Sequence, residues 1–302
     1  LGGNDWPMSD ELKGMLLGVI GVAIFSVTLP ATRIAVLGGL DAVFVGLGRA
    51  VAAAAVAALI LAVRRQPLPD RRHWGRLMVV ALGVVLGFPL FSAIAMVSVP
   101  AAHGGVVMGV LPLATTVAGA VLCGERPSAG FWTLAMFGSA LVVAFAVLKG
   151  AGGLVAGDWW LLLAVAAAGV GYAVGGELSR TLCGWQVICW ALVVSVPFIL
   201  PVVAWHMDGV NWGAPARVWA AFLYVALFSQ LLAFFAWNRG LALGGVARVG
   251  QVQLLQVFMT LIASAVLLGE EIDAVTIGFA IAVVGVVGLG RRMPVERKGG
   301  GD

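Results

Sequence analysis

Charged residues are scarce in this sequence. They make up 11% of its 302 positions, against roughly 25% in an average soluble domain. Hydrophobic residues make up 62% of the chain. A water-soluble domain of this length could not remove so much apolar surface from water, so the composition excludes that class. It indicates a polytopic membrane protein whose surroundings are lipid.

Cysteine and histidine are also rare, with three of each. The cysteines are odd in number and lack metal-binding spacing, so they predict neither a disulfide framework nor a metal site. No two histidines have ligand spacing. No Walker sequence, Ser/His/Asp set or GxGxxG in a strand–helix context occurs. We therefore expect no cofactor, and the chain has no room for the nucleotide domain that transport driven by ATP would require.

The net charge of +4 is weak evidence for nucleic-acid binding. The basic residues lie in short loops and near the carboxyl end, and the aromatic residues lie inside apolar runs. This distribution predicts no nucleic-acid partner.

Apolar runs long enough to cross a bilayer follow one another along the chain. Backbone exposed to lipid must satisfy its own hydrogen bonds, so each run is expected to be helical. The sequence therefore predicts an all-α fold with ten transmembrane helices. They cover roughly 13–36, 42–63, 76–98, 102–123, 129–148, 158–179, 185–205, 216–239, 245–268 and 273–291.

The distribution of Lys and Arg predicts the orientation. With the amino terminus inside, 14 of the 18 basic residues fall on cytoplasmic segments, three fall outside and Arg49 lies within a span. Because basic residues are retained on the cytoplasmic side, both tails, 1–11 and 293–302, are expected in the cytoplasm. The predicted location is the bacterial inner (plasma) membrane.

An internal repeat divides the chain. Leu111–Glu125, LPLATTVAGAVLCGE, returns 145 positions later as Gln256–Glu270, QVFMTLIASAVLLGE. Phe25–Arg33 resembles Tyr172–Arg180 at an offset of 147. Each half, 12–148 and 158–292, holds five predicted spans. Because five is odd, the second half must cross the membrane in the opposite sense, and such inverted repeats are typical of secondary transporters.

These residues resemble the drug/metabolite transporter superfamily in its ten-helix, EamA-type branch. Members carry a proline 13 residues before a Gly-Glu that ends the fourth span, matched by Pro112 and Gly124–Glu125. Asp41 and Arg49 match the second span, whereas Val257 stands where the second half usually has proline. The resemblance covers about 12–292 and is greatest to bacterial exporters of aromatic and other neutral amino acids. It implies a central cavity between spans 1, 3, 4, 6, 8 and 9.

Polar residues within the spans are the candidates for binding a substrate, because such groups must face protein or a water-filled cavity. Gln253, Gln256 and Thr260 share one helix face. A cavity polar on one side and apolar on the other would suit a zwitterion with an apolar side chain. The alternative is that the glutamines only join helices, a contact worth roughly 1 kcal/mol. The predicted substrate-binding residues are Ser26, Phe88, Ser92, Met108, Pro112, Thr115, Tyr172, Gln230, Trp237, Gln253, Gln256 and Thr260.

Three further residues are candidates for hinges or for coupling. Pro30 and Pro89 each remove a backbone donor within a span, which makes either a hinge or a static kink. Glu177 is an acid inside a span, but Arg180 lies three residues on and offers it an ion pair. Arg49 is expected to snorkel toward water or to cap a neighbouring helix's carbonyls.

The sequence thus favours a secondary transporter, not an enzyme. It would export small neutral metabolites, above all aromatic and other neutral amino acids, by alternating access. The same superfamily also handles sugar phosphates, nucleotide sugars and drugs. Phosphate would require basic residues at mid-span, and an intramembrane enzyme or scramblase would require paired acids or a nucleophile with a base. The expected partners are a small-molecule substrate and the lipid bilayer, and the sequence leaves the oligomeric state open.

Overall fold

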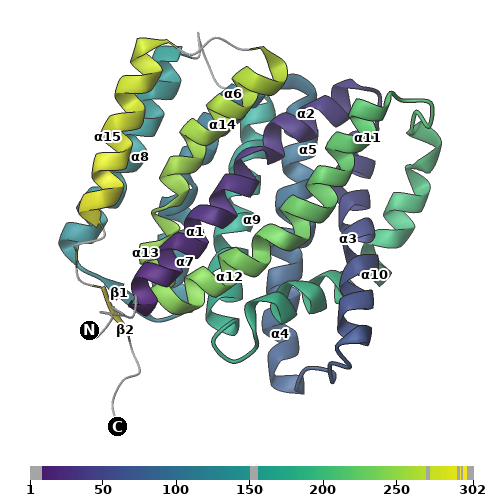
Figure 1. Ribbon diagram of the computed structural model, residues 1–302, viewed down its shortest axis with the longest axis horizontal. Coiled ribbons are helices and arrows are strands. Elements are labelled where there is room, and N and C mark those ends of the chain that lie inside the picture. Colours follow the sequence, from purple (N-terminus) through teal and green to yellow (C-terminus); the bar gives the residue numbers. More distant parts are fainter. Residues whose placement is uncertain (1–8, 150–155, 270–272, 291–292, 294, 298–302) are drawn as a thin grey trace, which may run out of the picture.

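The molecule is a bundle of long apolar helices (Figure 1). The computed structural model describes residues 9–149, 156–269, 273–290, 293 and 295–297. Within these, eight helices are long and apolar enough to cross a membrane. The predicted all-α polytopic membrane fold is confirmed, and the count of ten spans stays a prediction. The predicted repeat end at Glu270 lies outside the described residues.

Several spans consist of more than one helical segment. The first half contains α1 (Asp10–Ser26), α2 (Thr28–Leu37), η1 (Phe44–Gly48), α3 (Arg49–Val63), α4 (Arg71–Val80), η2 (Ala81–Gly87), α5 (Phe88–Ser98), α6 (Ala101–Val107), η3 (Met108–Val110), α7 (Leu111–Leu122) and α8 (Ala129–Lys149). The second half contains α9 (Ala156–Leu178), α10 (Gly184–Trp205), η4 (Met207–Gly209), α11 (Ala216–Leu223), η5 (Tyr224–Leu232), α12 (Ala233–Gly244), α13 (Val246–Gly250), α14 (Gln253–Leu268) and α15 (Ala274–Gly290).

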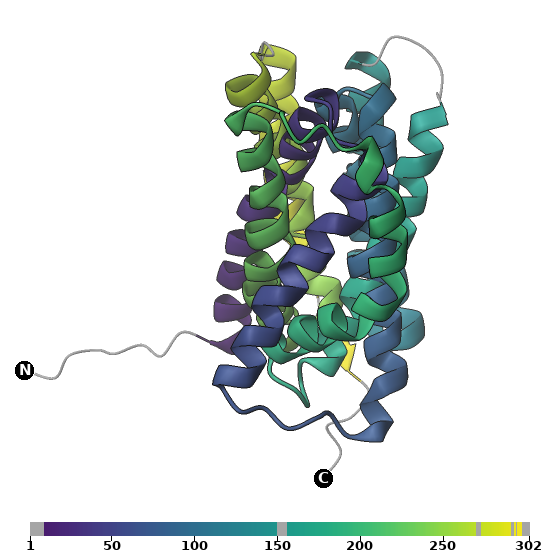
Figure 2. The ribbon, with the colours of Figure 1, turned by 90° about the vertical axis from the view of Figure 1, so that its right-hand side faces the viewer.

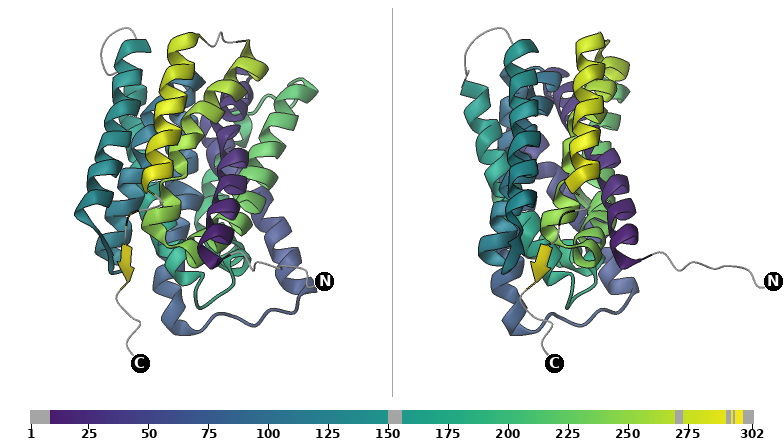
Figure 3. Two further views of the ribbon diagram at one scale, coloured as in Figure 1. Left: turned by 60° about the vertical axis from the view of Figure 1, so that its left-hand side comes forward. Right: turned by 90° about the vertical axis from the view of Figure 1, so that its left-hand side faces the viewer.

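Helix α9 lies inside the bundle, packed against α5, α7 and α12. Helices α8 and α15 lie side by side at one edge (Figures 1 and 3). The start of α1 and the link 64–70 lie at one end of the bundle, and the link between α10 and α11 lies at the other end (Figure 2). Helices α7 and α14, which carry the repeated sequence, run in opposite directions (Figure 1).

A short β-ribbon joins the predicted carboxyl-terminal tail to the bundle. Strand β1 (Glu125–Pro127) pairs antiparallel with β2 (Val295–Arg297), with Glu125 opposite Arg297. The ribbon lies at the same end as the start of α1 (Figure 1). The sequence predicted 293–302 only as a cytoplasmic tail, and backbone pairing draws 295–297 onto the link before α8.

Glycines end both copies of the repeated helix. Gly124 has a φ of 67° and Gly269 a φ of 78°. Glycine adopts this left-handed conformation without steric cost, which makes it the usual residue after a helix. The turn at Gly124 directs the following Glu125 back toward the bundle.

In the described part of the chain, three π-helical segments interrupt the spans, namely η1, η2 and η5. In η2 the N–H of Phe88 bonds to the carbonyl of Gly83, five residues earlier. The next residue, Pro89, has no N–H, so the carbonyl of Val84 loses its partner in the helix. A group outside the helix must therefore bond to the Val84 carbonyl, since no water is at hand in a bilayer.

Helices α1 and α12 approach so closely that only glycine fits between them. A Cβ placed on Gly14 would lie 2.6 Å from the backbone nitrogen of Gly244 and 2.9 Å from the carbonyl oxygen of Gly240. Such small-residue contacts replace the hydrophobic effect as the force that joins helices in lipid.

We expect Gly14→Ala to destabilise the protein, because the added methyl group meets backbone that cannot rotate away. Overpacking of this kind costs about 1–3 kcal/mol. Thermal unfolding in detergent would show a lower Tm. Gly278→Ala is the matched control, because no atom lies within 4 Å of a Cβ at that exposed position. Equal Tm values for the two variants would contradict the close approach of α1 and α12.

Candidate functional site

All twelve predicted substrate-binding residues are buried. Gln230, Trp237, Ser92 and Thr115 have no exposed surface. The side chains fall into two groups. An aromatic and cationic group, called the central group below, lies between α1, α3, α5, α9 and α12. An amide and hydroxyl group lies between α7 and α13–α14.

Four aromatic side chains form the centre of the first group. Phe25 on α1 contacts Tyr172 on α9 and Phe234 and Trp237 on α12, with ring centroids 5.0 to 6.1 Å apart. Tyr172 also contacts Phe234 at 5.8 Å and Trp237 at 5.4 Å. The sequence predicted Tyr172 and Trp237 but missed Phe25 and Phe234. Phe25 could have been found, because it is the repeat mate of Tyr172.

A hydrogen-bonded chain beside these rings contains a charge. Gln230 donates from Nε2 to the Val84 carbonyl at 2.9 Å, which satisfies the group left free by Pro89. Its Oε1 accepts from Nε of Arg49 at 3.0 Å. The Arg49 side chain is 1% exposed, and Cζ lies 6.0 Å from the centroid of the Phe88 ring.

Of the two alternatives predicted for Arg49, snorkelling to water is therefore wrong, and the described bond goes to the side-chain oxygen of Gln230 instead of a helix carbonyl. The side chain does not follow its helix to the membrane boundary, because Gln230 on η5 and Phe88 on α5 hold the guanidinium inside the bundle. The central region contains a fixed positive charge that sequence reasoning did not place there. The available signal was that Arg49 is the basic residue lying within a span.

The second group joins the two copies of the repeat. Thr115 donates from Oγ1 to Oε1 of Gln253 at 3.1 Å. This bond is the helix-to-helix use of glutamine that the sequence offered as the alternative. Gln256 differs, because its buried Oε1 has no partner among the described residues.

Packing within the second group is matched between the halves. A Cβ on Gly250 would meet the Thr115 methyl group at 3.2 Å, and one on Gly105 would meet the Thr260 methyl group at 2.9 Å. Gly105 and Gly250 are 145 residues apart, as are Thr115 and Thr260. The contact between α13 and α7 is therefore equivalent to the contact between α6 and α14.

The prolines lie where the helix geometry changes. Pro30 follows the break at Val27 between α1 and α2, and Pro89 follows η2. Pro112 is in the first turn of α7, after the 3₁₀ turn η3. Met108 begins that turn. Two other predicted residues bond within their own helices, Ser26 to the Ala23 carbonyl and Ser92 to the Pro89 carbonyl.

Glu177 pairs with Arg180, with Oε2 of Glu177 2.9 Å from Nη1. Both side chains are partly exposed. Such a pair contributes little to stability. The geometry is that of the ion pair expected from the spacing of the two residues.

A basic side chain contacts an acidic one at each end of the bundle. Nη1 of Arg248 on α13 lies 2.5 Å from Oε2 of Glu11 on α1. At the opposite end, Nε2 of His103 on α6 lies 2.7 Å from Oδ1 of Asp158 on α9. Glu11 and Asp158 differ by 147 residues and His103 and Arg248 by 145, so the two pairs are repeat mates.

Glu125 makes further contacts at the end of the bundle that holds Arg248. Its buried carboxylate accepts from the backbone N–H of Val246 at 2.8 Å and of Ala247 at 2.6 Å. These amides begin α13 and have no partner within the helix. The positive end of the helix dipole also favours a carboxylate here. The Glu of the Gly-Glu motif therefore attaches the end of α7 to the start of α13.

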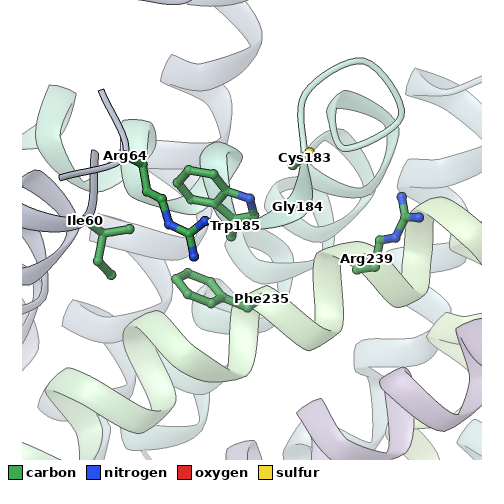
Figure 4. A pocket seen from close by; sticks show the side chains of 7 residues that line it. All are labelled: Ile60, Arg64, Cys183, Gly184, Trp185, Phe235 and Arg239. Atoms are coloured by element: carbon green, nitrogen blue, oxygen red, sulfur yellow. The ribbon is translucent and has the colours of Figure 1, made fainter. Parts of the chain in front are cut away.

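A hollow of about 480 Å³ lies near the same end, between the end of α3, the start of α10 and α12 (Figure 4). Its lining includes Arg64, Trp185, Phe235 and Arg239. None of the twelve predicted substrate-binding residues lines it. It is a boundary feature, separate from the central group.

We expect Glu125→Gln to destabilise the protein, because an amide oxygen can replace one carboxylate oxygen but its NH₂ group faces a second donor. An unsatisfied buried donor costs about 1–3 kcal/mol, which would lower the Tm in detergent. Glu177→Gln is the control, since it removes a partly exposed ion pair worth about 0–1 kcal/mol. A Tm no lower for Glu125→Gln than for Glu177→Gln would show that Glu125 does not hold α13.

The EamA-like transporter family matches the chain twice, over residues 12–148 and 155–291. The "Uncharacterized transporter YdeK" of Bacillus subtilis is 44% identical over 288 residues, which span 94% of this chain and 99% of that protein. The "Probable terminal-alkyne amino-acid exporter" of Streptantibioticus cattleyicolor is 27% identical over 93% of this chain and 94% of that protein.

A solved structure described as "Crystal structure of protein" has the same fold. It aligns with a TM-score of 0.72 at 20% identity, over 92% of this chain and 98% of that chain. Two matches of one family in tandem account for the paired contacts of the two halves. This chain is a membrane protein that belongs to the EamA-like transporter family.

Proposed function

We propose that the protein is a secondary transporter that exports small neutral metabolites, chiefly aromatic and other neutral amino acids. The observation that carries the proposal is the central group itself. Phe25, Tyr172, Phe234 and Trp237 offer an apolar surface for a side chain. The buried Nε2 of Gln253 and Oε1 of Gln256 have no described partner and can bond to polar ends. The 27% identical relative is named an amino-acid exporter, which supports this substrate class.

The proposed mechanism is alternating access between two inverted halves, 12–148 and 158–292. The side-chain pairs Glu11–Arg248 and Asp158–His103 lie at opposite ends and are repeat mates. Opening one end breaks one pair while the other stays formed. Because each broken contact joins a carboxylate to a basic side chain, the inward-open and outward-open states are expected to have similar energies. The prolines Pro30, Pro89 and Pro112 are the proposed bending points.

Other substrate classes fit the central group less well. Among the described residues, Arg49 is the one buried Arg or Lys, whereas a sugar phosphate or nucleotide sugar brings two or more negative charges. The buried acids of the described chain, Glu125 and Asp158, have partners at the ends of the bundle. A cationic drug or an intramembrane reaction would require an acid at the centre.

We expect purified protein in liposomes loaded with unlabelled phenylalanine to accumulate labelled phenylalanine by exchange. Tryptophan and leucine should compete, and glucose 6-phosphate, a nucleotide sugar and a cationic dye should not. Empty liposomes are the control. Exchange of the phosphate compounds or the dye alone, or no exchange above empty liposomes, would contradict the proposed substrate class.

We further propose that the end holding Glu11, Arg248 and β2 faces the bacterial cytoplasm. The exposed Cys183 precedes α10, the first residue of which lines the hollow beside Arg64 near that end. With Cys123 and Cys189 replaced by Ala, a membrane-impermeant maleimide should label Cys183 in inverted vesicles but not in intact cells stripped of the outer membrane. Asp208→Cys, in a Cys183→Ala background, should give the reverse pattern, because Asp208 is exposed in η4 at the other end. Exchanged patterns would invert the orientation.

A further inference from the structure

Arg49 carries a charge that nothing described in the protein neutralises. The side chain is 1% exposed, and none of the ion pairs among the described residues includes it. Its buried Nη1 has no hydrogen-bond partner in that part of the chain. An unpaired charge inside a bilayer costs several kcal/mol, so such residues mark sites of function.

The neighbours of Arg49 orient the guanidinium without neutralising it. Gln230 is held at both ends of its amide, by the Val84 carbonyl and by Nε of Arg49. A neutral amide oxygen satisfies one N–H but supplies no charge. The face of the Phe88 ring lies within the range of a cation–π contact. The arrangement therefore fixes the guanidinium by Nε and leaves Nη1 for another acceptor.

The contacts that recur in both halves do not explain the buried charge of Arg49. At the offsets of 145 to 147 residues that relate the two halves, the counterparts of Arg49 are 194–196, which are Val, Ser and Val. The matched contacts described above occur in both halves, whereas this one occurs in one. An arginine that only packed helices together would bury the N–H groups of Nη1 without a hydrogen-bond acceptor.

A carboxylate is the chemical group that matches the unpartnered guanidinium of Arg49. A carboxylate carries one negative charge and accepts the planar N–H groups of a guanidinium with matching geometry. Gln230, which bonds to Arg49, lies four residues before Phe234 and seven before Trp237, both of which pack against Tyr172 in the aromatic cluster. In that cluster Trp237 also has a buried Nε1 without a described partner. A carboxylate and an apolar side chain on one small molecule would therefore meet both parts of the central group.

We propose that Arg49 is the substrate's carboxylate anchor, with Nη1 donating to the α-carboxylate while the side chain of the amino acid lies against Tyr172 and Trp237. This rests on the proposed function and deepens it, because it makes the carboxylate the required feature of the substrate. Binding occurs when the halves separate enough to admit the molecule beside the rings. The carboxylate of the substrate then neutralises the guanidinium of Arg49.

The test compares L-phenylalanine with L-phenylalaninamide, which has the same side chain and ammonium group but no carboxylate. The wild-type protein in liposomes should exchange phenylalanine and not the amide. Arg49→Gln should raise the KM for phenylalanine by at least about tenfold, the loss expected when one partner of a buried charge pair is removed. Arg49→Lys should retain part of the affinity, because it keeps the charge but not the planar fork. Arg64→Gln is the matched control, since it removes an exposed arginine outside the central group.

A second measurement separates binding from folding. Phenylalanine should raise the Tm of the wild-type protein and of Arg64→Gln in detergent, and should not raise that of Arg49→Gln. If Arg49→Gln does not fold, the smaller shift of Arg49→Lys relative to Arg64→Gln tests the same point. Unchanged KM and Tm shift in the Arg49 variants, or equal exchange of the amide by the wild type, would overturn the anchor and leave the exporter proposal standing. Failure of the wild type to exchange any amino acid would overturn the proposed function instead.

Discussion

A bilayer supplies no water to polar groups, and the centre of this molecule is arranged by that constraint. Pro89 cannot donate to Val84, the free Val84 carbonyl binds Gln230, and Gln230 in turn holds Arg49. Each step satisfies a polar group left open by the previous one. The chain of bonds ends at Nη1 of Arg49, where no described group completes it. The kink at Pro89 thus determines, through Gln230 on η5, where the charge of Arg49 on the neighbouring α3 lies.

Matched contacts connect this centre to the ends of the bundle. The pairs Glu11–Arg248 and Asp158–His103 use mates from the two halves at opposite ends, and the packing of Thr115 on Gly250 is repeated by that of Thr260 on Gly105. Under the proposed inverted repeat, a movement that opens one end meets contacts like those that close the other. Arg49 lies outside this symmetry, which suits a binding group better than a structural one.

Much of the fold was predictable because burial in lipid limits the choice of structure. The apolar runs, their helical state and the burial of all twelve candidate residues follow from composition and spacing. The strand at 295–297 was not predictable, because backbone pairing leaves no mark in so short a segment. Phe25 could have been predicted from its repeat mate Tyr172. Phe234 could not, because the sequence does not distinguish an apolar residue that faces lipid from one that faces protein.

By itself, the amino-acid sequence determined that this chain lives in a membrane, that it is helical, and which residues of its two halves correspond. These properties depend on composition and on distances along the chain. Only the tertiary structure decided that Arg49 is buried against Gln230 and Phe88 and that Glu125 binds the start of α13. Those contacts depend on the rotation of each helix about its axis, which the π-helical turns at η1, η2 and η5 change, and on which distant segments become neighbours.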